Sequence, residues 1–314
     1  MTTVVGSGAL TFEVADGWGT LPEGMSLKET PDVAVDSKDN VYAFSRGDHG
    51  VVVFDRDGNY LKAWGAEVFG NAHGICIGPD DAVYCVDNGD HTVRKFSIDG
   101  ELLMTLGTKD KPSPRFSGDA FNLPTGLAVS NKTGDLFISD GYGNSRIHKY
   151  SGDGEHIMSW GEAGIGPSQF VIPHNICTDM DDNVYVADRE CHRVQVFDAN
   201  GKLQAMWNNI WKPSGIRVGA DGNVYVAELI ADAYYSDAPN FGHRVTVYDQ
   251  SGNRVAVLGD NYWGEKPGQF VSPHGICLDS HGDVYVGEVS WTMMGRTLEP
   301  PREMRSLQKL VRKG

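Results

Sequence analysis

Residues 173–207 read PHNICTDMDDNVYVADRECHRVQVFDANGKLQAMW and contain one full copy of a pattern that recurs along the chain. A Pro-x-Gly-Ile-type segment leads through a polar turn into a Val-Tyr-Val-type segment and an acidic residue. A second turn, an Arg-Val-x-x-Phe-type segment and a segment ending at tryptophan or leucine follow. β-Branched and aromatic segments of about five residues, separated by Gly- and Asn-containing turns, predict antiparallel strands. Each copy therefore predicts one four-stranded antiparallel sheet.

The pattern occurs six times at intervals of roughly 40–60 residues, a period typical of propeller blades. The last copy lacks a fourth strand, and residues 12–19 near the N-terminus, FEVADGWG, resemble the fourth strands of the other copies. An N-terminal strand that completed the last blade would remove an exposed sheet edge. We predict an all-β fold, a six-bladed β-propeller of four-stranded antiparallel blades, with residues 1–314 as a single domain.

Bulk composition excludes several classes of function. The 314 residues carry a formal net charge of −15 without a run of lysine and arginine, so we expect no binding to nucleic acid or to an anionic membrane. Five cysteines without a Cys-x-x-Cys pair argue against a disulfide framework. The N-terminus shows no basic segment followed by an apolar one, and no apolar run of about eighteen residues exists. We expect a cytoplasmic protein.

Histidine occupies one position in every second copy of the repeat. If six copies close into a ring, three imidazoles from alternate copies converge about 120° apart, as in a three-histidine metal site. A single buried histidine is usually a packing residue, but three at one repeat position favour a metal. Zinc suits three imidazoles with an open fourth position, and iron, manganese and copper accept the same ligands. Along the chain the position reads Asp32, His73, Thr125, His174, Ser214 and His274.

Arg46, Tyr142 and Arg189 follow the second strands of the first, third and fourth copies. In an antiparallel blade this place shares one face with the start of the first strand, so we expect these residues beside the metal. Arginine binds carboxylates through two N–H groups, and tyrosine can move a proton near a metal. Alternatively, both arginines pair with acidic neighbours. Aligned acids recur too regularly for catalysis, and we expect them to hold turn backbone: Asp87, Asp140, Asp188, Glu228 and Glu288.

The sequence also makes predictions for the other histidines and for three long insertions. A turn position before the third strand holds histidines that we assign to backbone bonding rather than metal: His49, His91, His192 and His243. Three isolated histidines are expected to be exposed: His148, His156 and His281. Three long insertions fall on the face of the metal site, where binding residues usually lie: 108–123, 229–242 with Tyr234 and Tyr235, and 290–306.

The repeat resembles the NHL family over residues 31–287. A closer resemblance, to peptidyl-α-hydroxyglycine α-amidating lyase, lies in the strings FSRGDH at 44–49, SDGYGNSRI at 139–147, Pro-His at 173–174 and ADRE at 187–190. That resemblance implies a six-bladed zinc lyase that cleaves the C–N bond of an α-hydroxyglycine to an amide and glyoxylate. It implies zinc ligands at the three histidines, Tyr142 as the base, and Arg46 and Arg189 as residues that bind the substrate carboxylate.

Two departures from that family shape the functional prediction. Gly143 stands where the family has a disulfide-forming cysteine, and Gly275 stands where it has an acid associated with structural calcium, which argues against calcium here. We therefore expect a zinc-dependent lyase for a small carboxylate-bearing α-hydroxy amide, hydroxyglycine- or ureidoglycolate-like. The alternatives are a zinc hydrolase of an amide, imide or lactone at the same site, and a non-catalytic interaction propeller.

Overall fold

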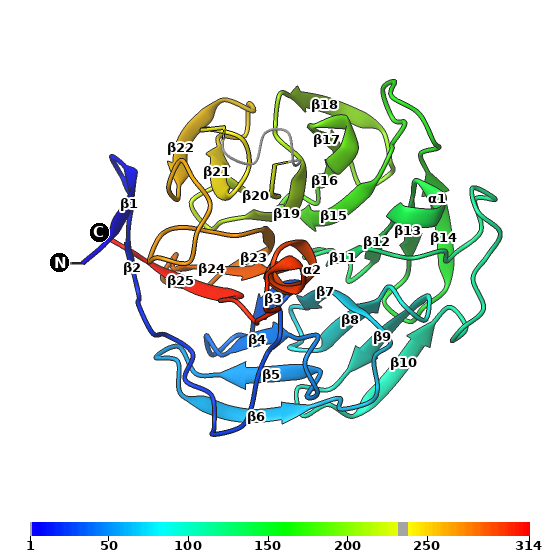
Figure 1. Cartoon of the computed structure of the whole chain (residues 1–314). Helices are drawn as coiled ribbons and strands as arrows, with labels where there is room; N and C mark the ends of the chain where they lie inside the picture. The colour runs from blue at the N-terminus through cyan, green and yellow to red at the C-terminus, as the bar shows by residue number, and fades with distance from the viewer. Residues whose placement is uncertain (1, 232–237) are drawn as a thin grey trace. The chain divides into compact units, whose positions relative to one another are not determined.

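The computed structural model describes residues 2–231 and 238–314, so Tyr234 and Tyr235 of the 229–242 insertion lie outside the described residues. Within those ranges six antiparallel sheets follow one another along the chain (Figure 1). The fold is the predicted six-bladed β-propeller, with the sequence copies as blades. Among the residues described, no helix combines the length and apolar character that crossing a membrane requires.

The first four blades each contain four strands in chain order. Blade one is β3 (Asp32–Val35), β4 (Val41–Phe44), β5 (Val51–Phe54) and β6 (Tyr60–Trp64). Blade two is β7 (Ala72–Ile77), β8 (Val83–Asp87), β9 (Thr92–Phe96) and β10 (Leu102–Leu106). Blade three is β11 (Gly126–Val129), β12 (Leu136–Asp140), β13 (Arg146–Tyr150) and β14 (His156–Trp160). Blade four is β15 (Pro173–Thr178), β16 (Val184–Asp188), β17 (Arg193–Phe197) and β18 (Leu203–Asn208).

The last two blades confirm the N-terminal closure and add one strand to the prediction. Blade five is β19 (Pro213–Val218), β20 (Val224–Glu228), β21 (Arg244–Tyr248) and β22 (Arg254–Leu258). Blade six is β23 (Pro273–Leu278), β24 (Val284–Glu288) and β25 (Leu307–Arg312), and β2 (Leu10–Val14) pairs antiparallel with β25. A hairpin at Gly8 then adds β1 (Val4–Ser7), so blade six has five strands rather than four.

The second strands form the inner core of each blade. Every residue of β4, β8, β12, β16, β20 and β24 is buried, which explains their continuous β-branched and aromatic sequences. The fourth strands β10, β14 and β22 expose many side chains instead. In several blades the tyrosine of the second strand donates to an aspartate of the preceding turn, as Tyr185 does to Asp179 at 3.2 Å. These bonds satisfy phenol groups that would otherwise be buried without a partner.

The backbone divides into two compact units: unit 1 is Met1–Ala66 with Arg217–Gly314, and unit 2 is Glu67–Ile216. Unit 2 contains blades two to four, and unit 1 contains blades one and six. Short helices follow three second strands within these units: α1 (Gly141–Asn144) follows β12, η1 (Arg189–Cys191) follows β16, and α2 (Ser290–Met293) with η2 (Gly295–Thr297) follows β24. The segments that carry Tyr142 and Arg189 are therefore helical turns anchored at strand ends.

Candidate active site

Each of the three aligned histidines is the extra residue of a β-bulge at the start of a first strand. The pairing register of β15 with β16 shifts between Pro173 and Asn175, and His174 is the residue between them. The same shift surrounds His73 in β7 and His274 in β23. A bulge changes the direction in which its extra side chain points relative to the regular alternation. His73 and His174 belong to unit 2, and His274 belongs to unit 1.

The aligned acids hold the backbone just before each histidine, as the sequence predicts. In blade two the Asp87 carboxylate accepts the N–H groups of Gly70 and Asn71, at 2.6 and 2.9 Å. In blade four Asp188 accepts the N–H of Val171 at 3.1 Å. Glu288 accepts those of Val271 and Ser272, at 2.6 and 2.9 Å. In these three blades the acid at the end of the second strand thus fixes the start of the first strand, and with it the bulge.

Backbone carbonyls set the tautomer of the three imidazoles. Nδ1 of His73 lies 2.6 Å from the Thr125 carbonyl oxygen, and Nδ1 of His174 lies 2.9 Å from that of Ser214. In unit 1, Nδ1 of His274 lies 2.7 Å from the Pro31 carbonyl oxygen. A carbonyl only accepts hydrogen bonds, so each Nδ1 carries a proton, and in the neutral imidazole the lone pair is then on Nε2. Bonds of this kind orient metal-binding histidines in proteins.

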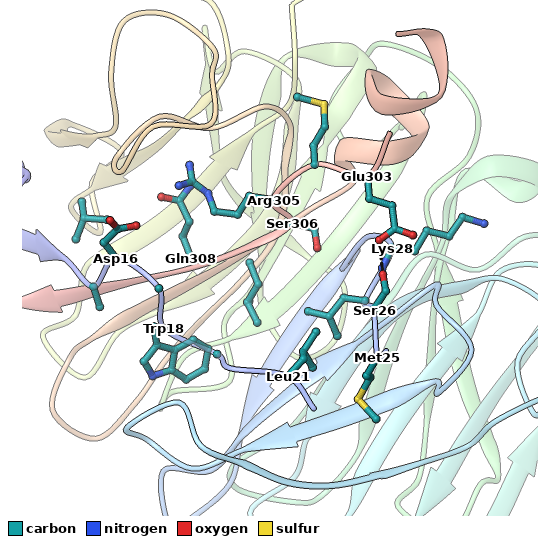
Figure 2. Close-up of a pocket in the computed structure, with 17 residues that line it drawn as sticks. Asp16, Trp18, Leu21, Met25, Ser26, Lys28, Glu303, Arg305, Ser306 and Gln308 are labelled. Carbon is teal, nitrogen blue, oxygen red and sulfur yellow. Dashed lines mark hydrogen bonds between the residues drawn. The ribbon is translucent and has the colours of Figure 1, made fainter. Parts of the chain in front are cut away.

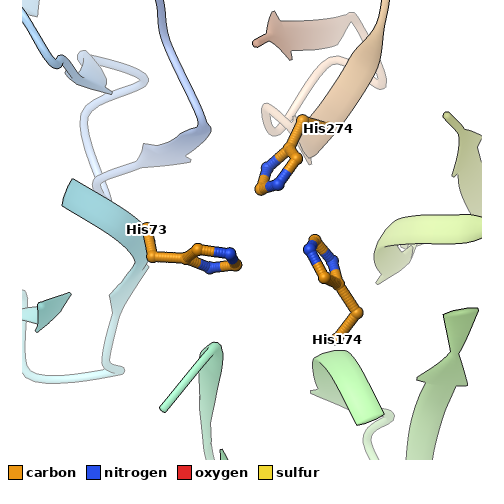
Figure 3. A group of neighbouring side chains, drawn as sticks. All are labelled: His73, His174 and His274. Atoms are coloured by element: carbon orange, nitrogen blue, oxygen red, sulfur yellow. The ribbon is translucent and has the colours of Figure 1, made fainter. Parts of the chain in front are cut away.

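The hydroxyl of Tyr142 lies among the polar groups of unit 2. It is 3.2 Å from Nε2 of His73 and 3.0 Å from Nε2 of His174, whose ring centroids are 4.9 Å apart. Figure 3 shows these two rings turned toward one another, and it labels His274 on β23 of unit 1. Nη1 of Arg189 donates to the same hydroxyl at 3.0 Å, and its guanidinium lies 5.2 Å from the tyrosine ring centroid. Unit 2 therefore brings four of its predicted site residues together.

Helix α1, which carries Tyr142, is held by the insertion at 108–123. The Asn122 carbonyl accepts the Gly143 N–H at 3.0 Å, and the Phe116 N–H donates to the Gly143 carbonyl at 2.9 Å. The side chain of Asn122 donates to the Ser113 carbonyl at 2.5 Å, and Arg115 donates to the Tyr142 carbonyl at 3.3 Å. Sequence reasoning assigned no role to Asn122, because a single asparagine near the end of a loop gives no signal of its own.

Both arginines pair with acidic neighbours. Arg189 donates to Tyr142 and, through Nε, to Glu190 at 2.8 Å. Burial lowers the pKa of the Arg189 guanidinium, but the oxygens of Tyr142 and Glu190 outweigh it and raise that pKa, so the group stays charged. In unit 1, Nη1 of Arg46 lies 2.8 Å from Oε1 of Glu29, a buried carboxylate that the sequence gave no reason to single out.

The remaining histidines divide into one confirmed group and one wrong prediction. In the turn position before the third strand, Nδ1 of His91 and of His192 accepts a backbone N–H, from Leu123 and Lys212 respectively. His243 in the same position bonds the Val271 carbonyl at 2.7 Å. Backbone bonding, as predicted, explains these three. His148 was expected to be exposed, but it is buried between Asp140 and Ser159 at 3.3 and 2.7 Å.

Unit 1 also contains a cavity of about 490 Å³ between the segments 14–28 and 303–308 (Figure 2). Trp18, Leu21 and Met25 give it an apolar middle, while Asp16 with Arg305 and Ser26 with Glu303 supply polar ends. His274 and Arg46 are not among its lining residues. The cavity is therefore separate from the predicted site residues of unit 1.

The NHL repeat matches residues 121–150 and 170–197, in blades three and four. NHL repeat-containing protein 3 of Homo sapiens is 38% identical over 237 residues, which cover 70% of this chain and 67% of that protein. The chain belongs to the family of NHL-repeat proteins.

Relatives of this NHL-repeat protein include proteins named as amidating lyases, which confirms the resemblance noted from its motifs. Peptidyl-alpha-hydroxyglycine alpha-amidating lyase 1 of Drosophila melanogaster is 30% identical over 254 residues, covering 72% of this chain and 44% of that protein. The chain thus spans less than half the length of the fly protein. A solved structure, "Streptogramin B lyase structure", covers 91% of this chain and 95% of its own with a TM-score of 0.60. At 15% identity it shows the fold alone.

Proposed function

We propose that this NHL-repeat protein is a metal-dependent lyase that cleaves the C–N bond of an α-hydroxy amide bearing a carboxylate. Its products are an amide and an oxo acid. The observation that carries the proposal is the place of the Tyr142 hydroxyl, within 3.2 Å of two imidazole Nε2 atoms and of the Arg189 guanidinium. The name of the fly relative, an alpha-hydroxyglycine amidating lyase, supports the same reaction class.

The proposed metal ligands are Nε2 of His73, His174 and His274. Their tautomers suit a cation, because each Nδ1 faces a carbonyl and each Nε2 presents a lone pair. The Tyr142 hydroxyl lies near two of these Nε2 atoms but can donate its one proton to only one of them. The group of side chains therefore has more hydrogen-bond acceptors than donors, which suits a cation. Zinc, which accepts three imidazoles and one further ligand, would polarise the substrate hydroxyl as a Lewis acid.

Tyr142 is the proposed base, in its phenolate form. It takes the proton of the substrate hydroxyl, the carbon–oxygen double bond forms, and the C–N bond breaks with its electron pair passing to nitrogen. The proton that Tyr142 took then passes to the nitrogen, which restores the phenolate, and amide and oxo acid together contain every atom of the substrate. Arg189 donates to the phenolic oxygen at 3.0 Å and would stabilise its negative charge without leaving that position.

Arg46 is the proposed partner of the substrate carboxylate. Arginine can bind a carboxylate through two parallel N–H groups, which fixes orientation as well as charge. Arg189 has less capacity for this role, because its Nε bonds Glu190 and its Nη1 bonds Tyr142. The resemblance assigned substrate binding to both arginines. In this proposal they have different roles: Arg189 stabilises the Tyr142 base, and Arg46 binds the substrate carboxylate.

Product analysis tests this function. The metal-loaded full chain is incubated with N-benzoyl-α-hydroxyglycine and, separately, with ureidoglycolate, and we expect glyoxylate equimolar with benzamide or urea. A hydrolase would instead place solvent oxygen from ¹⁸O-water in a carboxylate product. The human relative is named for its repeats alone, which favours a non-catalytic interaction propeller as the second candidate. Absence of turnover together with less than stoichiometric metal would support that candidate and reject the lyase.

A further inference from the structure

Glu29 is a buried carboxylate with contacts on two sides in unit 1. Its side chain is 1% exposed, and Oε1 lies 2.8 Å from Nη1 of Arg46. The same oxygen accepts the hydroxyl of Thr292 at 2.6 Å, and Oε2 accepts the Thr292 N–H at 2.7 Å. The Arg46 N–H also donates to the Glu29 carbonyl at 3.0 Å. One carboxylate thus joins Arg46 to helix α2 at the start of the 290–306 insertion.

Two further contacts tie the residues around Glu29 to the same insertion. The Ser26 hydroxyl donates to the Glu303 carboxylate, and both residues lie at one end of the cavity in Figure 2. The ammonium group of Lys28 lies 5.7 Å from the Trp291 ring centroid. The segment 26–29 is therefore attached to residues 290–306 at three places. Glu29 also bonds Arg46, so the insertion can influence that guanidinium through it.

The geometry of the Glu29–Arg46 pair is compatible with a substrate carboxylate on Arg46. The bond to Glu29 is made by Nη1 of the guanidinium, a rigid planar group of five N–H donors. A buried carboxylate that is hydrogen-bonded on both oxygens has a fixed position, and a charge-assisted bond transmits that position to its partner. An arginine side chain that is not held in this way would lose rotamer freedom on binding substrate.

We propose that Glu29 is a positioning residue: it holds the Arg46 guanidinium ready for the substrate carboxylate and couples it to the 290–306 insertion through Thr292. The inference rests on the carboxylate-binding role of Arg46 in the proposed function. A merely structural ion pair would stabilise unit 1 without distinguishing acidic from neutral substrates. The two readings therefore differ in a measurable way.

Steady-state kinetics on the metal-loaded full chain distinguish them, with N-benzoyl-α-hydroxyglycine and its methyl ester as substrates. Glu29→Gln should raise KM for the acid about tenfold, leave kcat within about twofold, and leave the ester unchanged. Thr292→Val, which keeps the backbone N–H, should raise KM for the acid about threefold. Glu303→Gln is the matched control, since it neutralises a carboxylate that contacts the same segment through Ser26 rather than through Arg46, and should change neither substrate.

A double-mutant cycle completes the test. If Glu29 acts through Arg46, the variant that combines Glu29→Gln with Arg46→Ala should bind the acid no worse than Arg46→Ala alone. Additive losses, or equal changes for acid and ester, would overturn the proposal. If the unmodified chain turns over neither compound, the proposed lyase function fails, and the same variants are compared by calorimetric titration with glyoxylate. Glyoxylate affinity that falls equally in Glu29→Gln and Arg46→Ala supports the positioning role, whereas no binding or unaltered binding rejects it.

Discussion

Replacing Gly143 with alanine should disturb the helix that presents Tyr142. An ideal Cβ at this position would lie 2.0 Å from Oδ1 of Asn122 and 2.6 Å from its carbonyl oxygen. The amide end of Asn122 can rotate away, but it would lose its bond to the Ser113 carbonyl. The carbonyl oxygen is backbone and accepts the N–H of residue 143, so that contact is relieved only if α1 moves.

The size of the effect follows from these contacts. Overpacking of this kind typically costs about 1–3 kcal/mol of unfolding free energy. For a chain of this size that corresponds to a fall in Tm of about 2–9 °C. A shift of α1 by about 1 Å would also move the Tyr142 hydroxyl from its partners, and misplacement on that scale can cost about 100-fold in turnover. Metal content should stay unchanged, because the three imidazoles are oriented by the carbonyls of Thr125, Ser214 and Pro31 rather than by α1.

Gly70→Ala is the matched control, because its added Cβ would meet no atom closer than 3.6 Å and its φ is not left-handed. Thermal unfolding, elemental analysis and turnover are measured on both variants and the parent. We expect Gly143→Ala to lose thermal stability and turnover, and Gly70→Ala to retain both. A Gly143→Ala protein with the Tm and turnover of the parent would refute the reasoning that the 108–123 insertion sets the position of the tyrosine.

Three further predictions test the site and the core. His174→Ala should lose the bound metal and all turnover while keeping its far-ultraviolet circular dichroism, and stoichiometric metal in that variant would contradict its role as a ligand. Tyr142→Phe should keep the metal but lose about 10²–10⁴-fold in turnover, whereas full activity would exclude the tyrosine as base. Burial and then Asp179 raise the pKa of Tyr185, so its stabilising contribution is complete below about pH 10 and is lost at higher pH. Tyr185→Phe should therefore be about 1 kcal/mol less stable at pH 7 yet lose less stability between pH 9 and pH 11.5, and denaturant curves with the same pH slope as the parent would contradict this.

The sequence predicted the fold because six copies of one pattern share their turns and strand residues. Each copy repeats the buried second strand, and five of the six copies place an acid after it, so a copy that is ambiguous alone can be interpreted from the others. Strand β1 could not be found in this way. Residues Val4–Ser7 pair with Thr11 and its neighbours in β2, and in the described part of the chain the other five blades show four strands each, so the repeat offers nothing with which to align them.

The histidine position was predictable for the same reason, but the bulge and the partners of the side chains were not. A bulge depends on the register between two strands, and the register changes by one residue without a change in hydrophobic pattern. Glu29 lies outside any repeated string, and its contact with Thr292 joins residues 263 positions apart. Such pairings depend on tertiary structure and leave no local signal.

The prediction that His148 is exposed was wrong because its repeat position holds different polar residues in different blades. His148 pairs with Ile138 in the second strand, and equivalent third-strand positions hold other polar residues: Arg94, Gln195, Thr246 and Gln308. Four of the five contact the acid that ends the second strand of their blade, at 3.6 Å for Arg94 and 3.3 Å for His148. Most of these side chains share a contact with the acid but not a residue type, so His148 looked isolated in the sequence.

In blade three the acid at the end of the second strand is Asp140, and it contacts a residue before the first strand and a residue at the end of helix α1. Asp140 accepts the N–H of Asn122 at 2.9 Å through Oδ1, while its Oδ2 accepts the Asn144 side chain at 2.8 Å. Asn122 lies before the first strand, as the residues held by the other acids do, and Asn144 ends the helix that carries Tyr142. The acid that fixes the start of the first strand in blade three therefore also holds the end of the turn around the tyrosine. The tyrosine of blade three therefore uses a contact that the acids of other blades also make, to which the 108–123 insertion adds its own bonds.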